Sequence, residues 1–209
     1  GDSNRYQRTA LCIATMNNTG TGGRIAEADF VSFGTGAFTV NWTTAPAAGR
    51  YYFYVAMAGA QVKVGSFNQP TVTGNQAITG LGFKSDGILY SSFNEVAGTT
   101  APVHARQTIG FASSTTARGC HWMGDQDAAD PTIADTNLDR TKVLKLMTEG
   151  TPTLNASADH VSFDSDGFTW NWDTVDATAR EILYLAFGSL VAADLPYQPY
   201  YQRSPLLAQ

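Results

Sequence analysis

The densest group of side chains capable of chemistry lies in the stretch GDQDAADPTIADTNLD. It holds five carboxylates: Asp125, Asp127, Asp130, Asp135 and Asp139. Clustered carboxylates can hold a hard cation such as Ca²⁺, or act as a paired general acid and base. More often a run of like charges is a solvated loop kept open by its own repulsion, and we favour that interpretation. Asp125, Asp127 and Asp130 stay as weak candidates for a metal site, and no cofactor is expected.

The other polar residues do not combine into a catalytic set. Cys120 and His121 are neighbours on an expected strand, so their side chains should point to opposite faces and cannot form a nucleophile–base pair. Cys12 and Cys120 are the only cysteines, and we expect two buried free thiols rather than a disulfide. The sequence lacks a nucleophile elbow, a phosphate-binding glycine loop and a dinucleotide fingerprint. These patterns predict a protein that is not an enzyme.

Composition predicts an all-β protein. The 209 residues include 20 glycines, and only 15% of them are charged, which is typical of a globular β-protein with many turns. A net charge of −5 disfavours binding to nucleic acid, because phosphates need a basic surface. No apolar run approaches the roughly 20 residues of a membrane span, so we expect no membrane insertion.

An internal repeat organises the chain. The stretch ADFVSFGTGAFTVNWTTAPAAGRYYFYVAMAG (28–59) aligns without a gap with ADHVSFDSDGFTWNWDTVDATAREILYLAFGS (158–189), at a constant offset of 130. The identical positions in the first copy are Ala28, Asp29, Val31, Ser32, Phe33, Phe38, Thr39, Asn41, Trp42, Thr44, Ala47, Arg50, Tyr54 and Ala56. Chance does not produce such a match, so we interpret it as a duplication.

Each copy has the pattern of a hairpin followed by a buried strand. Alternating DFVSF and DHVSF predict one strand, and AFTVNW and GFTWNW predict its partner across turns at GTGA and DSDG. DSDG resembles the start of a calcium loop, but its Glu ligand is missing and a plain turn is favoured. The apolar runs RYYFYVAMAG and REILYLAFGS predict a central strand. We expect six core anchors: Phe38, Trp42, Tyr54, Phe168, Trp172 and Tyr184.

The second copy has a front half that the first copy does not have. We therefore expect a partial β-unit at residues 1–65, a complete unit at 66–193 and an extended C-terminal arm at 194–209. The fold class is an antiparallel β-sandwich, jelly-roll or concanavalin-like, with an internal half-domain duplication. A half-unit exposes an apolar face and free strand edges. Either the two halves pack into one pseudo-symmetric sandwich, or another chain supplies the missing strands. Independent folding of the half-unit is a third alternative.

The segments ITGLGFKSD…LYSSF, QTIGFASSTTARG and DGFTWNW…YLAFG resemble a family of bacteriophage tail- or virion-associated structural β-domains. Residues 76–190 cover the whole family pattern, and residues 10–59 cover its C-terminal half. Ser85 departs from the pattern, which usually has Pro there, so the turn at this point is expected to differ. The motifs consist of packing residues. The resemblance implies a fold and a virion location, and it transfers no catalytic residue.

We therefore expect a structural subunit of a phage virion, in its tail, baseplate, fibre or capsid. It would act by assembly with itself and other virion proteins, as a homo-oligomer. Contacts would use sheet edges and the arm, with interface residues Tyr197, Tyr200, Tyr201 and Arg203. The alternative is a carbohydrate- or receptor-binding module of a tail tip that binds a cell-surface glycan through exposed aromatic rings.

Overall fold

The computed structural model describes residues 5–8, 10–17, 23–56, 59–98, 102–131 and 133–189, which form strands and turns without any helix. The strands are β1 (Ile13–Met16), β2 (Arg24–Gly34), β3 (Ala37–Thr44), β4 (Gln61–Asn68), β5 (Gly74–Thr79), β6 (Gly87–Ser92), β7 (Ala105–Ala112), β8 (Arg118–Asp125), β9 (Ala134–Asp139), β10 (Leu144–Met147), β11 (Leu154–Asp164), β12 (Gly167–Thr174) and β13 (Glu181–Gly188). The predicted all-β class is confirmed. None of the described residues belongs to a helix long and apolar enough to cross a membrane.

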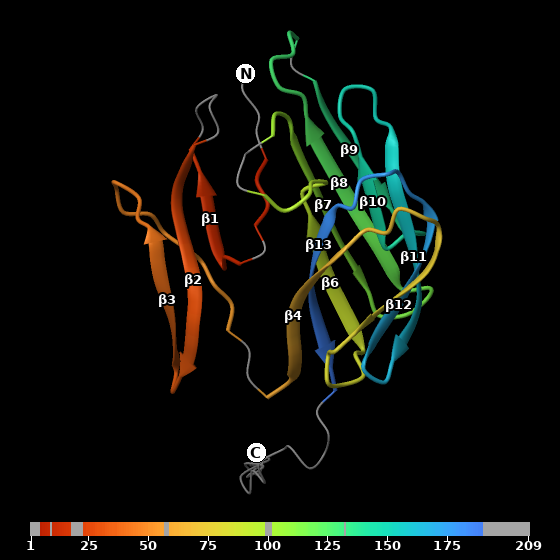
Figure 1. The fold of residues 1–209 in the computed structure, drawn as a ribbon, viewed down its shortest axis with the longest axis horizontal. Coiled ribbons are helices and arrows are strands. Elements are labelled where there is room, and N and C mark those ends of the chain that lie inside the picture. Colours follow the sequence, from red (N-terminus) through yellow and green to blue (C-terminus); the bar gives the residue numbers. More distant parts are fainter. Residues whose placement is uncertain are drawn as a thin grey trace, which may run out of the picture.

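Residues 61–188 form a β-sandwich (Figure 1). One sheet has six strands in the order β4-β13-β6-β7-β8-β9, and the other has four in the order β10-β11-β12-β5. All the strand pairs in both sheets are antiparallel. The hydrophobic core lies between these sheets. We call these residues the second unit.

Alternation along β12 explains how the four-stranded sheet packs. Phe168 and Trp170 are fully buried and Trp172 is 1% exposed, while the residues between them are only partly buried. A strand with this period of two places all three rings on one face. The ring of Trp170 contacts Phe67 of the opposite sheet edge-on at 5.1 Å, and Tyr90 at 5.0 Å. The aromatic residues of β12 therefore join the two layers.

Strand β13 lies inside the six-stranded sheet, next to the edge strand β4, and pairs with β4 on one side and β6 on the other. Ile182, Tyr184 and Ala186 on one of its faces are buried, while the residues between them are only partly buried. Gly65 of β4 lies opposite Tyr184, and a Cβ atom at Gly65 would be only 2.3 Å from the Tyr184 hydroxyl oxygen. The absence of a side chain on β4 makes room for the tyrosine ring.

Strands β1, β2 and β3 form a separate three-stranded sheet, drawn in red and orange in Figure 1. This sheet has no strand pairing with either sheet of the second unit. The hydrophobic core contains only residues of the second unit, and Phe38 and Trp42 of the three-stranded sheet are exposed, so the described chain does not form the pseudo-symmetric single sandwich expected as one alternative. We call β1–β3 together with residues 45–56 the first unit.

A short segment at residues 5–8 connects the two units by polar contacts. The Arg5 guanidinium donates to Glu95 at 2.5 Å, and the Gln7 amide donates to the Glu181 carbonyl at 2.7 Å. The hydroxyl of Tyr6, on the other side of the segment, lies 3.3 Å from the Glu27 carboxylate of β2. Alternate side chains of this extended segment thus reach opposite units.

The predicted domain boundary at residue 65 needs a correction. It falls inside β4, which pairs along its whole length with β13. The second unit begins at Gln61, because a strand paired along its whole length with β13 belongs to the same sheet. The predicted arm at 194–209 lies outside the described residues.

Candidate interaction surface

The repeated hairpins have the same strand register. In the first unit Ala28 pairs with Trp42 and Phe33 with Phe38, and their counterparts 130 positions later pair in the same way in the second unit. Register shifts occur at the same two places in both hairpins. Every side chain of β2 and β3 therefore has a structural counterpart in β11 and β12, whose surroundings can be compared directly.

The counterparts differ strongly in burial. In the second unit the predicted core anchors Phe168, Trp172 and Tyr184 are 0%, 1% and 7% exposed. The prediction that Phe38, Trp42 and Tyr54 are core anchors is wrong for the single chain, because they are 39%, 40% and 71% exposed. The physical reason is that no second sheet covers β1–β3 among the described residues.

Residues 51–56 supply only part of that missing layer. They correspond to β13, and Tyr54 packs edge-on against Phe38 with ring centroids 4.9 Å apart, as Tyr184 packs against Phe168 at 5.5 Å. Tyr52 covers the ring of Trp42 at 5.3 Å. The predicted strand at 51–57 does not form, because residues 51–56 have no strand beside them in the described structure, whereas β13 lies between β4 and β6.

The outward side chains of this segment are almost fully exposed. Tyr51, Phe53 and Val55 are 94%, 98% and 85% exposed. Contiguous exposed apolar side chains on a globular protein usually mark a surface that another molecule covers. The side of β2 and β3 that carries Phe38 and Trp42 corresponds to the buried side of β11 and β12. We call this side, together with residues 51–55, the open face.

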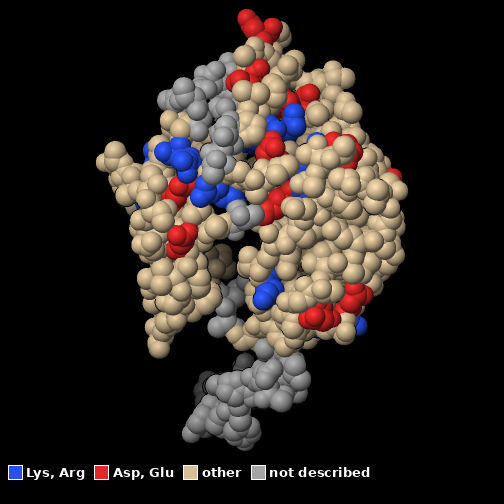
Figure 2. Space-filling view, viewed as in Figure 1, with Lys and Arg blue, Asp and Glu red and all other residues tan. Residues whose placement is uncertain are grey.

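The open face carries little charge. Strand β3 and residues 51–56 contain no Asp, Glu, Lys or Arg. In Figure 2 the lower part of the first unit is uncharged, charged side chains gather near the junction, and the surface is hollowed between the units. A low charge density is typical of the centre of a subunit interface.

The charged residues at the junction are satisfied within the chain. Glu27 is 5% exposed and accepts two hydrogen bonds of 3.0 Å from Arg24. Burial by itself would raise the pKa of Glu27, but the hydrogen bonds and positive charge of Arg24 outweigh it and lower the pKa. Arg24 and Glu27 both lie on β2, so this charge pair is formed within the first unit.

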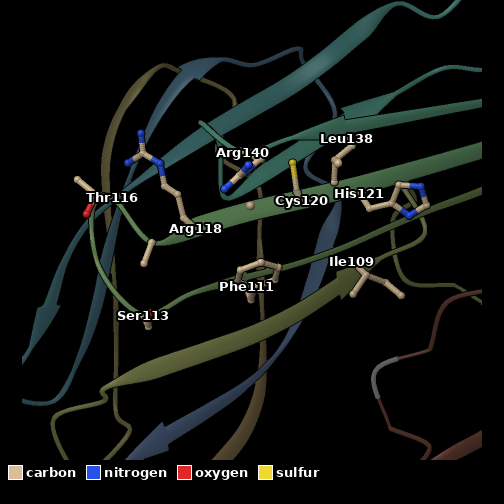
Figure 3. A pocket seen from close by; sticks show the side chains of 11 residues that line it. Ile109, Phe111, Ser113, Thr116, Arg118, Cys120, His121, Leu138 and Arg140 are labelled. Atoms are coloured by element: carbon tan, nitrogen blue, oxygen red, sulfur yellow. The ribbon is translucent and has the colours of Figure 1, made fainter.

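A hollow of about 450 Å³ lies on the outer face of β7–β9 (Figure 3). Its apolar lining includes Ile109, Phe111 and Leu138, and Arg118 and Arg140 lie at one end. The Cys120 thiol cannot serve as a nucleophile there, because burial raises its pKa to about 12. The nearby His121 imidazole is bonded to the Thr136 hydroxyl at 2.7 Å. Cys120 and His121 therefore do not form a nucleophile–base pair in this hollow.

The two cysteines are both free, but they differ in exposure. Cys120 is buried, as the sequence predicts. The prediction that Cys12 is also buried is wrong, because its thiol is exposed at the start of the uncovered sheet. The counterpart of this segment in the second unit is covered, and Leu144 and Leu146 of β10 are fully buried there.

The acidic stretch is spread over two strands and a loop. Asp125 ends β8, Asp127 and Asp130 lie in the loop, and Asp135 and Asp139 lie on β9. Asp139 pairs with Lys145 at 2.7 Å, and Asp135 accepts the Gly150 amide at 2.7 Å. Across the residues that the structure describes, no three His, Cys, Asp or Glu side chains are grouped closely enough to hold a metal ion. The weak metal candidates are not brought together.

Sequence reasoning missed the anchoring role of Arg5 and Gln7, since a polar segment before the first strand carries no periodic signal. It identified the turns GTGA and DSDG but did not foresee that Asp166 of DSDG binds the chain that leaves β5. The predicted interface residues Tyr197, Tyr200, Tyr201 and Arg203 lie outside the described residues. Comparison with protein-family models, curated proteins and solved structures gave no match.

Proposed function

We propose that this protein is a structural subunit that acts by assembly, and that the open face of its first unit is the main assembly surface. The observation that carries the proposal is the contrast within one repeat. The same Phe, Trp and Tyr are 0%, 1% and 7% exposed in the second unit and 39%, 40% and 71% exposed in the first. The first unit keeps the aromatic residues of a core, although the single chain does not bury them. We infer that another polypeptide covers them when the protein assembles.

The virion setting is part of this proposal. It is supported by the resemblance of residues 76–190 to phage virion-associated β-domains and by the uncharged open face. A subunit of a tail, baseplate, fibre or capsid contacts neighbours over much of its surface, so exposed apolar side chains are expected on it. The C-terminal arm, with its tyrosines, is proposed as a second contact.

Sedimentation velocity of the whole chain tests the proposal. An exposed apolar surface drives association when the concentration rises, so the wild-type chain is expected to exceed its monomer mass of 22.4 kDa. The double substitution Phe53→Ser and Val55→Ser should return it to the monomer. Both side chains are more than four-fifths exposed, so the change leaves the folded monomer intact.

The matched control is Leu138→Ser, because Leu138 is 70% exposed on the second unit, away from the open face. It should leave association unchanged. Removal of residues 194–209 tests the arm separately. Equal masses for the wild type and the double variant at all concentrations would remove the open face from the proposal. Binding of the monomer to a glycan array, lost on substitution of Tyr51 and Phe53, would favour the carbohydrate-binding alternative.

A further inference from the structure

We propose that the free edge of β3 pairs with a β-strand donated by a partner polypeptide, and that this strand is not β5 of a second copy of the chain. The partner strand is uncharged and antiparallel to β3. It places an Asn opposite Asn41 and a Gln amide beside the indole of Trp42, and it separates from β3 before Ala37. This inference rests on the proposed assembly through the open face.

The second unit shows what this edge is built to receive. Strand β5 covers the corresponding edge of β12, with Trp172 opposite Gly74 and Asn171 opposite Asn75. The Asn171 side-chain amide donates to the side-chain Oδ1 of Asn75 at 2.7 Å, and the Trp172 indole donates to the side-chain Oε1 of Gln76 at 2.9 Å. The donors of both bonds are side chains of β12.

The same donors occur on β3. Asn41 and Trp42 correspond to Asn171 and Trp172 in sequence and in register. The described chain has no strand on the β3 edge, since the sheet order is β1-β2-β3. An exposed strand edge of this kind is a template for strand addition. At this end of β3 the side chains specify a partner like β5.

The other end of the hairpin differs between the units. The Asp166 carboxylate accepts the amides of Gly80 at 3.1 Å and Gly82 at 2.5 Å, and so fixes the chain that leaves β5. Its counterpart is Gly36, which has no carboxylate. Gly167 allows β5 to approach closely, since a Cβ atom there would lie 1.9 Å from the Ile78 carbonyl oxygen.

The counterpart of Gly167 is Ala37, which carries that Cβ atom. A strand in the register of β5 would meet it with its backbone, and backbone atoms cannot move aside as a flexible side chain can. The β3 edge can therefore pair with a β5-like strand at Trp42, Asn41 and Val40. It cannot pair as closely with the residues that would continue that strand past Ala37. This single methyl group therefore disfavours exchange of β5 between two copies.

Two further observations define the partner. Strand β3 is uncharged, so a charged partner strand would lose solvation without gaining an ion pair. Residues 51–56, the counterpart of β13, have no strand beside them in the described structure, where β13 has β4 and β6. The donor is therefore a β-unit that supplies neighbouring strands as well, rather than an isolated peptide.

Disulfide trapping with synthetic peptides tests the register. The protein is the full chain carrying Cys12→Ser and Asn41→Cys, because Cys12 is exposed and Cys120 is buried. The probe is the peptide PTVTGNQA, from residues 70–77, with cysteine in place of its Asn. The control peptide carries cysteine in place of Gln, whose side chain points to the other face of the strand. We expect the first peptide to be trapped at least about tenfold faster than this control. Equal rates for the two peptides would overturn the register.

The role of Ala37 is tested with the longer peptide PTVTGNQAITGL, from residues 70–81, added to the full chain. Its affinity should rise about tenfold on Ala37→Gly, while that of the shorter peptide stays unchanged. The matched control is Thr35→Gly, which loosens the same turn without removing the obstructing Cβ. If the longer peptide binds the unsubstituted chain as tightly as the Ala37→Gly variant, β5 exchange is allowed and the inference fails.

The two proposals fail in different ways. Association that depends on Phe53 and Val55, without register-selective trapping, removes the strand inference and leaves assembly through the open face. A wild-type chain that stays monomeric in sedimentation removes the assembly proposal itself. Circular dichroism of every variant shows whether its strands are retained.

Discussion

The repeat allows one substitution to be made twice in the same local structure. Tyr54 and Tyr184 are counterparts, and each packs edge-on against its own Phe, at 4.9 and 5.5 Å. They differ in what covers them, since Tyr54 is 71% exposed and Tyr184 is 7% exposed. The difference between Tyr54→Ala and Tyr184→Ala therefore isolates the effect of the covering layer.

The expected magnitudes follow from burial. A large aromatic ring buries roughly 200 Å² when it is fully covered, at about 25 cal/mol per Å². Tyr184→Ala also leaves a cavity in the sandwich, so it should lower the free energy of unfolding by about 4 kcal/mol. Tyr54→Ala removes the smaller buried part and leaves no closed cavity, so about 1 kcal/mol is expected.

Urea unfolding of dilute protein, monitored by tryptophan fluorescence, provides the measurement. Three of the four tryptophans are buried in the second unit, so the main transition reports on that sandwich. Tyr184→Ala should lower its midpoint strongly, and Tyr54→Ala should lower it by no more than corresponds to about 1 kcal/mol. A loss of several kcal/mol from Tyr54→Ala in the monomer would refute the conclusion that the open face is uncovered.

Three further predictions concern groups within the chain. Gly167→Ala should destabilise the sandwich by about 3 kcal/mol in urea unfolding, because the new Cβ atom meets the Ile78 carbonyl oxygen; an unchanged midpoint would contradict the close approach. Burial, and after it the positive charge of Arg118, lower the pKa of His160 below its unfolded value near 6.5. The unfolded chain therefore binds the proton more readily than the folded chain, and the free energy of unfolding should fall as the pH drops from 7.5 to 5.5. His160→Phe should remove that part of the pH dependence, by up to about 1.4 kcal/mol per pH unit, and an identical pH profile would contradict it. A thiol reagent should modify Cys12 rapidly in the native chain and Cys120 only after unfolding; two fast thiols would contradict the burial of Cys120.

The strands of the second unit could be predicted because their periodicity agrees with their surroundings. The pattern of GFTWNW placed Phe168 and Trp172 on one face, and the structure buries both. The apolar patterns of residues 88–93, 107–112 and 117–123 also predict strands, and these ranges lie close to β6, β7 and β8. Here each local signal is reinforced by a neighbouring strand.

The first unit shows where the same reasoning stops. RYYFYVAMAG has the composition of a central strand, yet residues 51–56 form none, because a strand needs hydrogen-bonding neighbours that periodicity does not supply. The residues of β9 were expected to be part of an acidic loop, since the alternating polar residues Asp135, Asn137 and Asp139 carry no apolar pattern. The sequence shows that Ala37 stands in the first unit where the second has Gly167. That this difference controls the approach of a neighbouring strand follows only from the position of the β5 backbone.

The central claim is that the open face is bare in the single chain and covered on assembly. Trp42 reports on it directly, because it is 40% exposed while the other tryptophans are at most 1% exposed. Acrylamide quenching of fluorescence should show, at low concentration, an accessible component that disappears in Trp42→Phe. As the concentration rises and the mass increases, that component should become protected. A Trp42 that is already protected in the dilute monomer, or stays accessible while the mass rises, would contradict the account.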